Sequence, residues 1–138
     1  MSAEIRKLIV SYFTNLSTHL LNKFGEFFPI AMGINEKGEI VPLHVYFGDE
    51  HPTSEQVIAE FQVAFKKLAS ENKFTLFAIC SDVFIAPPYL THKTDALEIR
   101  YQNNEKGSTN IYVPYKRNEK GILVFLESYE KNGSLDIF

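Results

Sequence analysis

Apolar residues recur every three or four positions over the first 24 residues of the chain, a spacing that predicts one long amphipathic helix. Ser2 is suited to cap its start, Glu4 suits the positive end of its dipole, and Gly25 predicts its end. The apolar stripe consists of Ile5, Leu8, Ile9, Tyr12, Phe13, Leu16, Leu20 and Phe24.

After this helix, apolar segments alternate with short polar ones, which predicts strands joined by turns. The tetrapeptide Asn-Glu-Lys-Gly occurs three times, at 35–38, 104–107 and 118–121. Asn is favoured at the first position of a type I turn and Gly at the fourth, so each copy predicts a chain reversal rather than a functional element. A shorter version, Lys-Asn-Gly at 131–133, predicts a further turn before the last five residues.

A second helix is predicted to begin after Pro52. Thr53 and Gln56 have the spacing of a capping box, in which each side chain accepts a hydrogen bond from a free backbone N–H group. Lys66 and Lys67 suit the negative end of its dipole. Its apolar face consists of Val57, Ile58, Phe61, Ala64, Phe65 and Leu68.

Two segments after this helix predict different kinds of strand. Residues 74–88 are apolar at both odd and even positions, which is typical of a strand in the interior of a sheet. Residues 96–102 alternate between apolar and polar, which indicates a half-exposed antiparallel strand. Pro42 and Pro114 lack the N–H group that a central strand needs, so each predicts an edge position or a bulge.

These elements predict one α+β domain over residues 1–138, with the order α-β-β-α-β-β-β-β. We expect a single antiparallel sheet of about five to six strands with two helices on one face. The order of elements is similar to that of profilin-like and roadblock-like sandwiches, a likeness of architecture that carries no function.

A sheet covered on one face leaves the other face bare. Tyr46, Tyr112 and either Phe77 or Phe84 are expected there, and an exposed aromatic surface of this kind favours a partner. A second copy of the chain is the simplest partner, so the sequence predicts a homodimer.

Charge and cysteine content narrow the class of protein. The net charge is -3 with acidic and basic residues mixed along the chain, so no basic stripe favours nucleic-acid binding. A single cysteine, Cys80, excludes an internal disulfide and fits a reducing compartment. The N-terminal segment lacks the features of a signal peptide and no run of about 20 apolar residues predicts a membrane span, so we expect a cytoplasmic protein without membrane contact.

The segment Gly-Asp-Glu-His-Pro at 48–52 is the densest group of reactive side chains. In one interpretation Asp49 acts as a general base with His51 as its partner. Because neighbouring residues rarely converge on one metal ion, we expect no metal site here. In the other interpretation the segment is an acidic loop before a helix, whose N-terminus suits an anion.

The segment Thr-His-Lys-Thr-Asp-Ala at 91–96 is the second group, again between a loop and a strand. Lys93 suits an anionic ligand and Asp95 suits hydrogen-bond donors. The alternative is an Asx-type turn that leads into the strand. The loop before this segment is long, and long loops often carry binding residues.

Two residues within the interior strand differ from their apolar neighbours. Cys80 has no basic residue nearby in sequence, so we expect a small buried side chain rather than a reactive thiolate. Asp82 lies on the same strand face and must either emerge at the end of the sheet or find a buried partner.

The segments FFPIAMGINEKGEIVPL, GDEHP, KTDALEI and IYVPYK together resemble a family of small uncharacterised bacterial proteins. The resemblance spans most of the chain after the first helix and implies no reaction or cofactor. It implies that Asp49, His51, Lys93 and Asp95 are the first residues to test for ligand binding.

Two functions from different classes follow as hypotheses. The first is a small non-catalytic binding module, dimeric, that takes a protein partner or a small ligand. The second is a small enzyme that uses Asp49 and His51, or Lys93 and Asp95, for acid–base chemistry on a small anionic substrate. No cofactor is expected, because the sequence has no P-loop, GxGxxG or CxxC motif.

Overall fold

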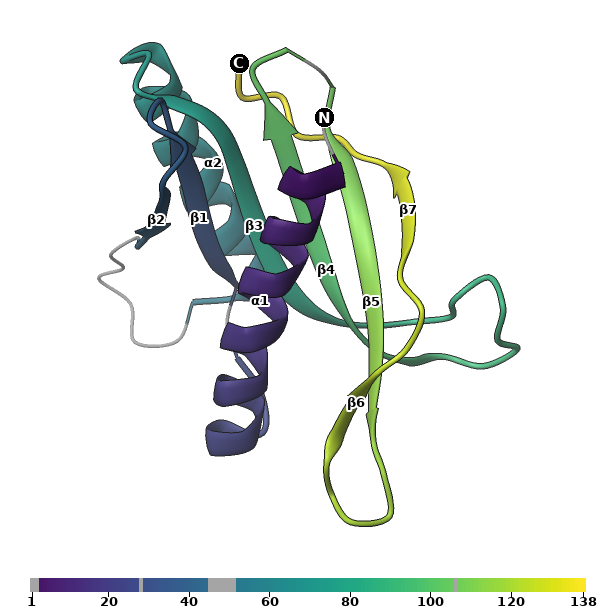
Figure 1. Ribbon diagram of the computed structural model, residues 1–138. Coiled ribbons are helices and arrows are strands. Elements are labelled where there is room, and N and C mark those ends of the chain that lie inside the picture. Colours follow the sequence, from purple (N-terminus) through teal and green to yellow (C-terminus); the bar gives the residue numbers. More distant parts are fainter. Residues whose placement is uncertain (1–2, 28, 45–51, 106) are drawn as a thin grey trace.

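Two helices and seven strands make up the computed structural model, which describes residues 3–27, 29–44, 52–105 and 107–138 (Figure 1). The helices are α1 (Ala3–Phe24) and α2 (Ser54–Ser70). The strands are β1 (Ile30–Asn35), β2 (Ile40–Leu43), β3 (Phe74–Ile85), β4 (Thr94–Asn103), β5 (Thr109–Arg117), β6 (Leu123–Phe125) and β7 (Tyr129–Asn132).

All neighbouring strands are antiparallel, in the order β2-β1-β3-β4-β5-β6, and β7 also pairs with β5. The predicted α+β class with one antiparallel sheet is therefore confirmed. Pro42 lies in β2 at the edge of the sheet, as expected, since an edge position tolerates the missing N–H group.

The strand count of five to six was too low because the segment after the third Asn-Glu-Lys-Gly turn forms two short strands. Both pair with β5, β6 with residues 115–117 and β7 with residues 109–112. Pro114 lies between these two stretches, and its carbonyl accepts a hydrogen bond from the N–H group of Leu126 at 2.7 Å. Because proline cannot donate to a neighbouring strand, the ladder on this side of β5 is interrupted at this position.

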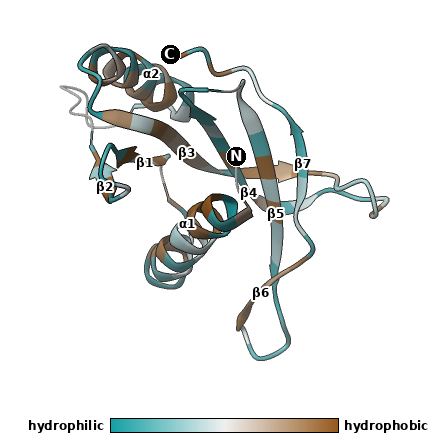
Figure 2. Cartoon of the chain, turned by 45° about the horizontal axis from the view of Figure 1, so that its top comes forward, coloured by the Kyte–Doolittle hydropathy of each residue, from teal (hydrophilic) through white to brown (hydrophobic). Residues whose placement is uncertain are grey.

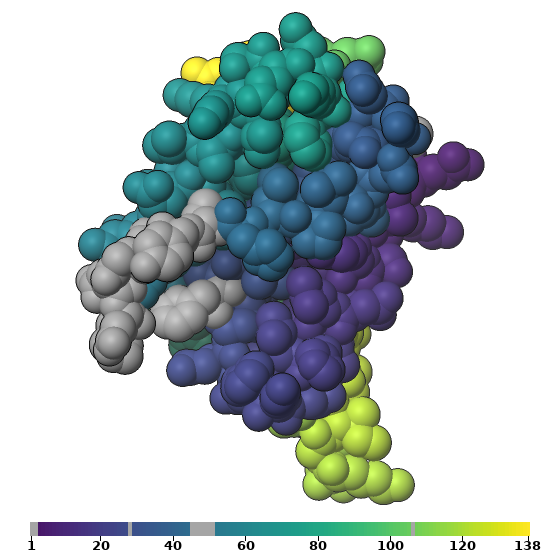
Figure 3. Space-filling view, turned by 90° about the vertical axis from the view of Figure 1, so that its left-hand side faces the viewer, coloured from purple at the N-terminus to yellow at the C-terminus, as the bar shows by residue number. Residues whose placement is uncertain are grey.

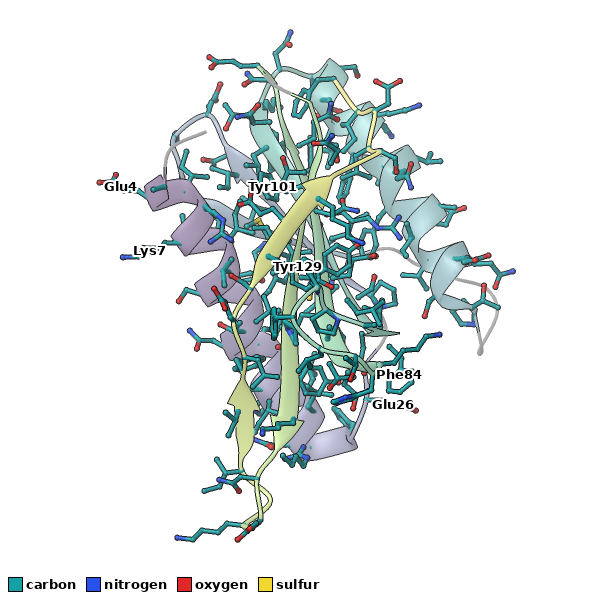
Figure 4. The ribbon with its side chains drawn as sticks, turned by 90° about the vertical axis from the view of Figure 1, so that its right-hand side faces the viewer. Glu4, Lys7, Glu26, Phe84, Tyr101 and Tyr129 are labelled. Carbon is teal, nitrogen blue, oxygen red and sulfur yellow. The ribbon has the colours of Figure 1, made fainter. Side chains whose placement is uncertain are left out.

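The expectation that both helices cover one face of the sheet was wrong. The helices pack on opposite faces, and Figure 4 shows the sheet between α1 on one side and α2 on the other. The physical reason lies in β3, which is apolar on both faces. Leu76, Ala78 and Cys80 belong to the core under α1, whereas Phe77 and Ile79 belong to the core under α2. If helices covered only one face of the sheet, the large side chains of Phe77 and Ile79 would be exposed to water.

The core under α1 is the larger of the two. Ile9, Phe13 and Leu21 of the helix are buried against strands β1, β3, β4 and β5. Arg117 of β5 holds the end of this helix, since its guanidinium donates to the carbonyl of Leu21 at 3.2 Å and to the side chain of Asn22 at 3.1 Å. A positive charge at the C-terminus of a helix also interacts favourably with its dipole.

The core under α2 includes the C-terminal tail. The predicted capping box is confirmed, since the side chains of Thr53 and Gln56 each accept a backbone N–H group. The turn predicted at 131–133 was wrong in part, since Lys131 and Asn132 belong to β7, and residues 134–138 form no strand. Leu135 and Ile137 are buried beside α2, and the N–H group of Ile137 donates to the side chain of Gln102 at 2.7 Å. Figure 2 shows the C-terminus close to α2.

The Asn-Glu-Lys-Gly segments join strands, as predicted, but with two local geometries. At 35–38 and 118–121 the side chain of the first Asn accepts two backbone N–H groups, and the fourth residue is a Gly with φ of 80° or 77°. The middle copy connects β4 to β5 differently. There Asn103, one residue earlier, accepts the N–H group of Glu105. The identical tetrapeptide therefore does not fix the turn geometry.

Candidate functional site

A cleft of about 760 Å³ lies between the end of α1, the segment that leads into β1, and the start of α2. Among the described residues its walls are mainly apolar, and two carboxylates line it. The residues around it are Leu20, Phe24, Glu26, Phe27, Pro29, Ile30, Ser54 and Asp82. Figure 3 shows the side of the molecule on which α1, the β1–β2 hairpin and α2 lie next to one another.

Asp82 is the best-fixed polar group of this cleft. It follows the buried stretch of β3 on the face that α1 covers, and its carboxylate is half-buried. The hydroxyl of Tyr115, on β5, donates a hydrogen bond to Asp82 Oδ1 at 2.5 Å. Tyr115 itself is buried. Asp82 therefore has the partner that its place in the sequence required, and that partner comes from two strands away.

The surroundings of Asp82 favour its protonated form. Burial raises the pKa of the Asp82 carboxyl, the hydrogen bond from Tyr115 lowers it, and the charges of Asp95 and Glu26 raise it further. Burial also raises the pKa of the Tyr115 hydroxyl far above its ordinary value, with the carboxylates of Asp82 and Asp95 adding to the effect. The phenol is thus a neutral donor at physiological pH.

Three carboxylates therefore act on this end of the sheet, from Asp82, Glu26 and Asp95. Among the described residues, Arg117 is the cation that acts on the pair, and it lowers the pKa of Tyr115. Phe84 pairs with Asp95 across β3 and β4, is 62% exposed, and lies at the same end of the sheet as Glu26 (Figure 4). Apolar walls next to a negative floor suit a ligand with an apolar body and a positive charge.

Of the four residues singled out in the sequence, Lys93 and Asp95 are described, and Asp95 takes part in this arrangement. Asp95 lies beside Ala96, the partner of Pro114, and its charge acts on both Asp82 and Tyr115. Lys93 is exposed in the loop between β3 and β4. Asp49 and His51 lie outside the described residues, so the enzyme hypothesis that uses them stays untested.

Sequence reasoning missed Glu26 and Tyr115. Glu26 follows a helix in a segment with no recognisable motif, and Tyr115 belongs to a strand whose pattern gives it no special role. A signal for Tyr115 does exist, since a buried Asp on an interior strand requires a donor. The identity of that donor depends on strand order, which the sequence alone does not give.

Cys80 and the start of α2 are the two remaining groups to which sequence reasoning gave a chemical role. Cys80 is buried, as expected, and burial raises the pKa of its thiol well above the ordinary value. The start of α2 was considered as an anion site. Its capping box uses the N–H groups of Thr53 and Gln56, which leaves fewer donors for an anion.

Within the described ranges, no three His, Cys, Asp or Glu side chains are grouped so that they could hold a metal ion. Neither of the described helices is both long enough and apolar enough to cross a membrane. No protein-family model, curated protein or solved structure matches the chain. The resemblance to small bacterial proteins therefore stays a prediction.

Proposed function

We propose that this protein is a small non-catalytic binding module, and that the cleft at Asp82 holds a small ligand with an apolar body and an ammonium group. The observation that carries the proposal is the Asp82 carboxylate at the edge of an apolar cleft of about 760 Å³. Tyr115 takes one of its two oxygens, and among the described residues no donor is recorded for the other.

The charge balance supports a cation as the polar part of this ligand. Asp95 and Glu26 raise the pKa of Asp82, which means that an ionised Asp82 is disfavoured in the empty cleft. An ammonium group placed near these carboxylates offsets the repulsion between them, because its positive charge pairs with their negative charges. The aromatic side chains of Phe24 and Phe27 supply apolar contacts. Because Lys23 Nζ already lies 5.2 Å from the centroid of the Phe24 ring, the cation–π contact with the ligand is assigned to Phe27.

The proposal favours binding over catalysis because, among the described residues, the cleft offers the carboxylates of Glu26 and Asp82 but no imidazole or amine. Tyr115 is held neutral by the rise in its pKa, and its hydroxyl engages one oxygen of Asp82. The arrangement fixes a charge rather than moving a proton.

Amide-resolved NMR titration tests the proposal with three probes of one shape: benzylamine, benzyl alcohol and benzoate. We expect benzylamine to shift the amides of residues 24–30 and 80–84, and the alcohol to shift them far less. An Asp82→Asn variant should weaken benzylamine binding at least fivefold, since it removes the charge and keeps the size. A Glu39→Gln variant, in the exposed first turn, is the matched control.

Equal binding of the amine and the alcohol, or an Asp82→Asn variant that binds as the parent does, would overturn the proposed ligand class. Binding should also weaken as the pH falls through the raised pKa of Asp82, because protonation removes the charge that attracts the amine.

We also propose that the protein forms a homodimer through a surface that includes Phe84, one of the aromatic residues that the sequence suggested for it. Phe77 is buried under α2, and among the described aromatic residues the largest exposed fractions are those of Phe24 at 63% and Phe84 at 62%. Native mass spectrometry and light scattering test this. A monomer at tens of micromolar would contradict it, and a dimer that Phe84→Ser converts to a monomer would support it.

A further inference from the structure

Strand β3 continues past the point where β1 meets it, which leaves part of its edge open. β1 pairs with β3 between Phe74 and Cys80, whereas β4 pairs with it as far as Ile85. On the side of β1, no described residue pairs with residues 81–85 of β3 (Figure 1). A strand in the middle of the sheet therefore has a free edge at its end, and such an edge is a template for pairing with another strand.

The alternation of hydrogen bonds along β3 shows which backbone groups lie at this open edge. Successive residues of an antiparallel strand direct their N–H and C=O groups to opposite sides. The carbonyl of Thr75 accepts the N–H group of Asn104 at 2.9 Å, on the side of β4. Because the register between β3 and β4 is unbroken, the even-numbered residues of β3 direct these groups toward β1. At the open edge they are Asp82 and Phe84, whose backbone groups make no hydrogen bond with the described residues.

The cleft at Asp82 lies along this open edge. It is lined by Leu20 of α1 and by Ser54 of α2, and these helices pack on opposite faces of the sheet. A cleft that touches both helices passes through the layer of the sheet, where β1 is absent and β3 continues. The segment before β1, which includes Glu26 and Phe27, lines it as well.

The volume of the cleft matches that of a short strand. One residue of a strand occupies about 160 Å³, because strands rise about 3.3 Å per residue, lie about 4.8 Å apart and form a layer about 10 Å deep. The volume of about 760 Å³ therefore has room for about four residues. This length fits the open stretch at 81–85.

From this geometry we infer that the ligand of the cleft is an extended peptide segment of a partner protein, which adds to β3 as an antiparallel strand and carries a lysine side chain to Asp82. The inference rests on the proposed function, whose ammonium group it identifies as that of the lysine. Main-chain hydrogen bonds to Asp82 and Phe84 supply affinity, and the side chains supply specificity. The antiparallel direction is that of every other pair of strands in this sheet.

The register of the added strand sets the sequence that it must carry. Residues opposite each other on neighbouring strands direct their side chains to the same face. A lysine opposite Asp82 therefore reaches its carboxylate, on which the charge of Glu26 also acts. The residue opposite Phe84, two positions earlier in the peptide, lies beside an exposed aromatic ring and is apolar. The expected pattern is an apolar residue, any residue, and then a lysine.

The test is an amide-resolved NMR titration of the full chain with acetyl-Val-Phe-Val-Lys-Val-amide and two N-methylated forms of it. We expect the unmodified peptide to bind about tenfold more tightly than benzylamine. N-methylation at the lysine removes an N–H group that faces β3 and should weaken binding about tenfold. N-methylation at the central valine, whose N–H group points away from β3, is the matched control and should change binding less than about twofold.

A second control keeps the composition of the peptide and changes only its spacing. In acetyl-Val-Val-Phe-Lys-Val-amide the phenylalanine and the lysine are adjacent, so their side chains point to opposite faces of the added strand. We expect this peptide to bind about fivefold more weakly than the alternating one. Equal binding of the two peptides would contradict a strand in this register.

Phe84→Pro and Phe84→Ala form a matched pair within the protein. Both remove the ring, but only proline removes the N–H group at the open edge, and that group takes no part in the ladder with β4. We expect Phe84→Pro to bind the peptide about fivefold more weakly than Phe84→Ala does, and both variants to bind benzylamine equally. The amide spectrum of each variant verifies that the fold is kept.

Failure of the added strand is distinguishable from failure of the proposed function. Benzylamine binding together with equal effects of the two N-methylations would overturn the added strand and leave the cleft as a site for a small amine. If neither benzylamine nor the peptide binds, the proposed function fails as well. A dimer that Phe84→Pro converts to a monomer and Phe84→Ala does not would assign the open edge to a second copy and overturn the partner peptide.

Discussion

The hydroxyl of Tyr115 on β5 donates a hydrogen bond to Asp82 on β3, across the strand that separates them. The bond links the two strands on the face that α1 covers, at the end of the sheet where the cleft opens. It fixes the direction of a carboxylate that burial and two neighbouring acids would otherwise drive to accept a proton.

Replacing Tyr115 with Phe removes this hydrogen bond and keeps the ring. The pKa of Asp82 should then rise further, because the bond from Tyr115 is what lowers it. We also expect a loss of about 1 kcal/mol in the free energy of unfolding. Carbon-detected NMR titration of the Asp82 carboxyl gives the first quantity and urea denaturation the second. An unchanged pKa in the variant would contradict the assignment.

The free energy of unfolding should depend on pH through the ionisation of Asp82. Its pKa is raised in the folded state, so the folded protein holds this proton more tightly than the unfolded chain does. The stability it contributes is complete below the ordinary value near 3.8 and is lost as the pH rises through the raised pKa. Asp82→Asn should remove this loss, so the variant gains stability relative to the parent across that interval.

Urea denaturation of the parent and of Asp82→Asn at pH 3, 5 and 7 measures that difference directly. The parent and the variant share every other titrating group, so the change in their difference with pH reports Asp82 alone. A difference that is constant from pH 3 to pH 7 would show that the carboxyl titrates normally.

Arg117 should stabilise the junction between α1 and β5. Its guanidinium donates to the Leu21 carbonyl and the Asn22 side chain at the end of the helix, and to the carbonyl of Gly121. We expect Arg117→Gln to lower the free energy of unfolding by about 1 kcal/mol. Lys116→Gln, which neutralises the exposed neighbour, should change it by less than about 0.5 kcal/mol. If both variants lowered the free energy of unfolding equally, the effect would come from the loss of a positive charge and not from these contacts.

Replacing the glycine with alanine should lower the free energy of unfolding by different amounts in different copies of the repeated turn. Gly121 has φ of 77°, a conformation that an L-residue adopts at a cost, so Gly121→Ala should destabilise by about 1 kcal/mol. Gly107 lies outside that region and an added Cβ atom meets nothing there. Gly107→Ala should therefore change stability by less than about 0.5 kcal/mol. Equal costs would contradict the two turn geometries.

Much of the fold could be predicted because local chemistry specifies it. The first helix, the Thr53–Gln56 capping box and the edge position of Pro42 all follow from short-range rules, and the structure agrees with each. The predicted apolar stripe was only partly right, since Ile5, Leu8 and Phe24 are exposed and Leu21 is buried instead. The prediction that α2 lies on the same face of the sheet as α1 was wrong, because the position of α2 depends on how both faces of β3 are covered. The apolar pattern of residues 74–80 already indicated that both faces of β3 are buried, whereas we expected helices on only one of them.

The candidate site was less predictable, since it is assembled from distant segments. Glu26 precedes β1, Asp82 ends the buried part of β3, and Tyr115 is on β5. Local spacing cannot show that these three meet. Asp95 was singled out because it follows a long loop. Its charge does raise the pKa of Asp82, but it does so because of the register between β3 and β4, which the sequence does not give.

The position of α1 has a consequence for how the protein forms during translation. This helix is synthesised before the sheet, yet the core in which Ile9 and Phe13 are buried includes Ile111 and Val113, about a hundred positions later. A nascent chain emerging from the ribosome must therefore keep an apolar stripe exposed until β5 has been synthesised. Contacts so distant in sequence form slowly, and the delay makes the newborn helix a target for chaperones.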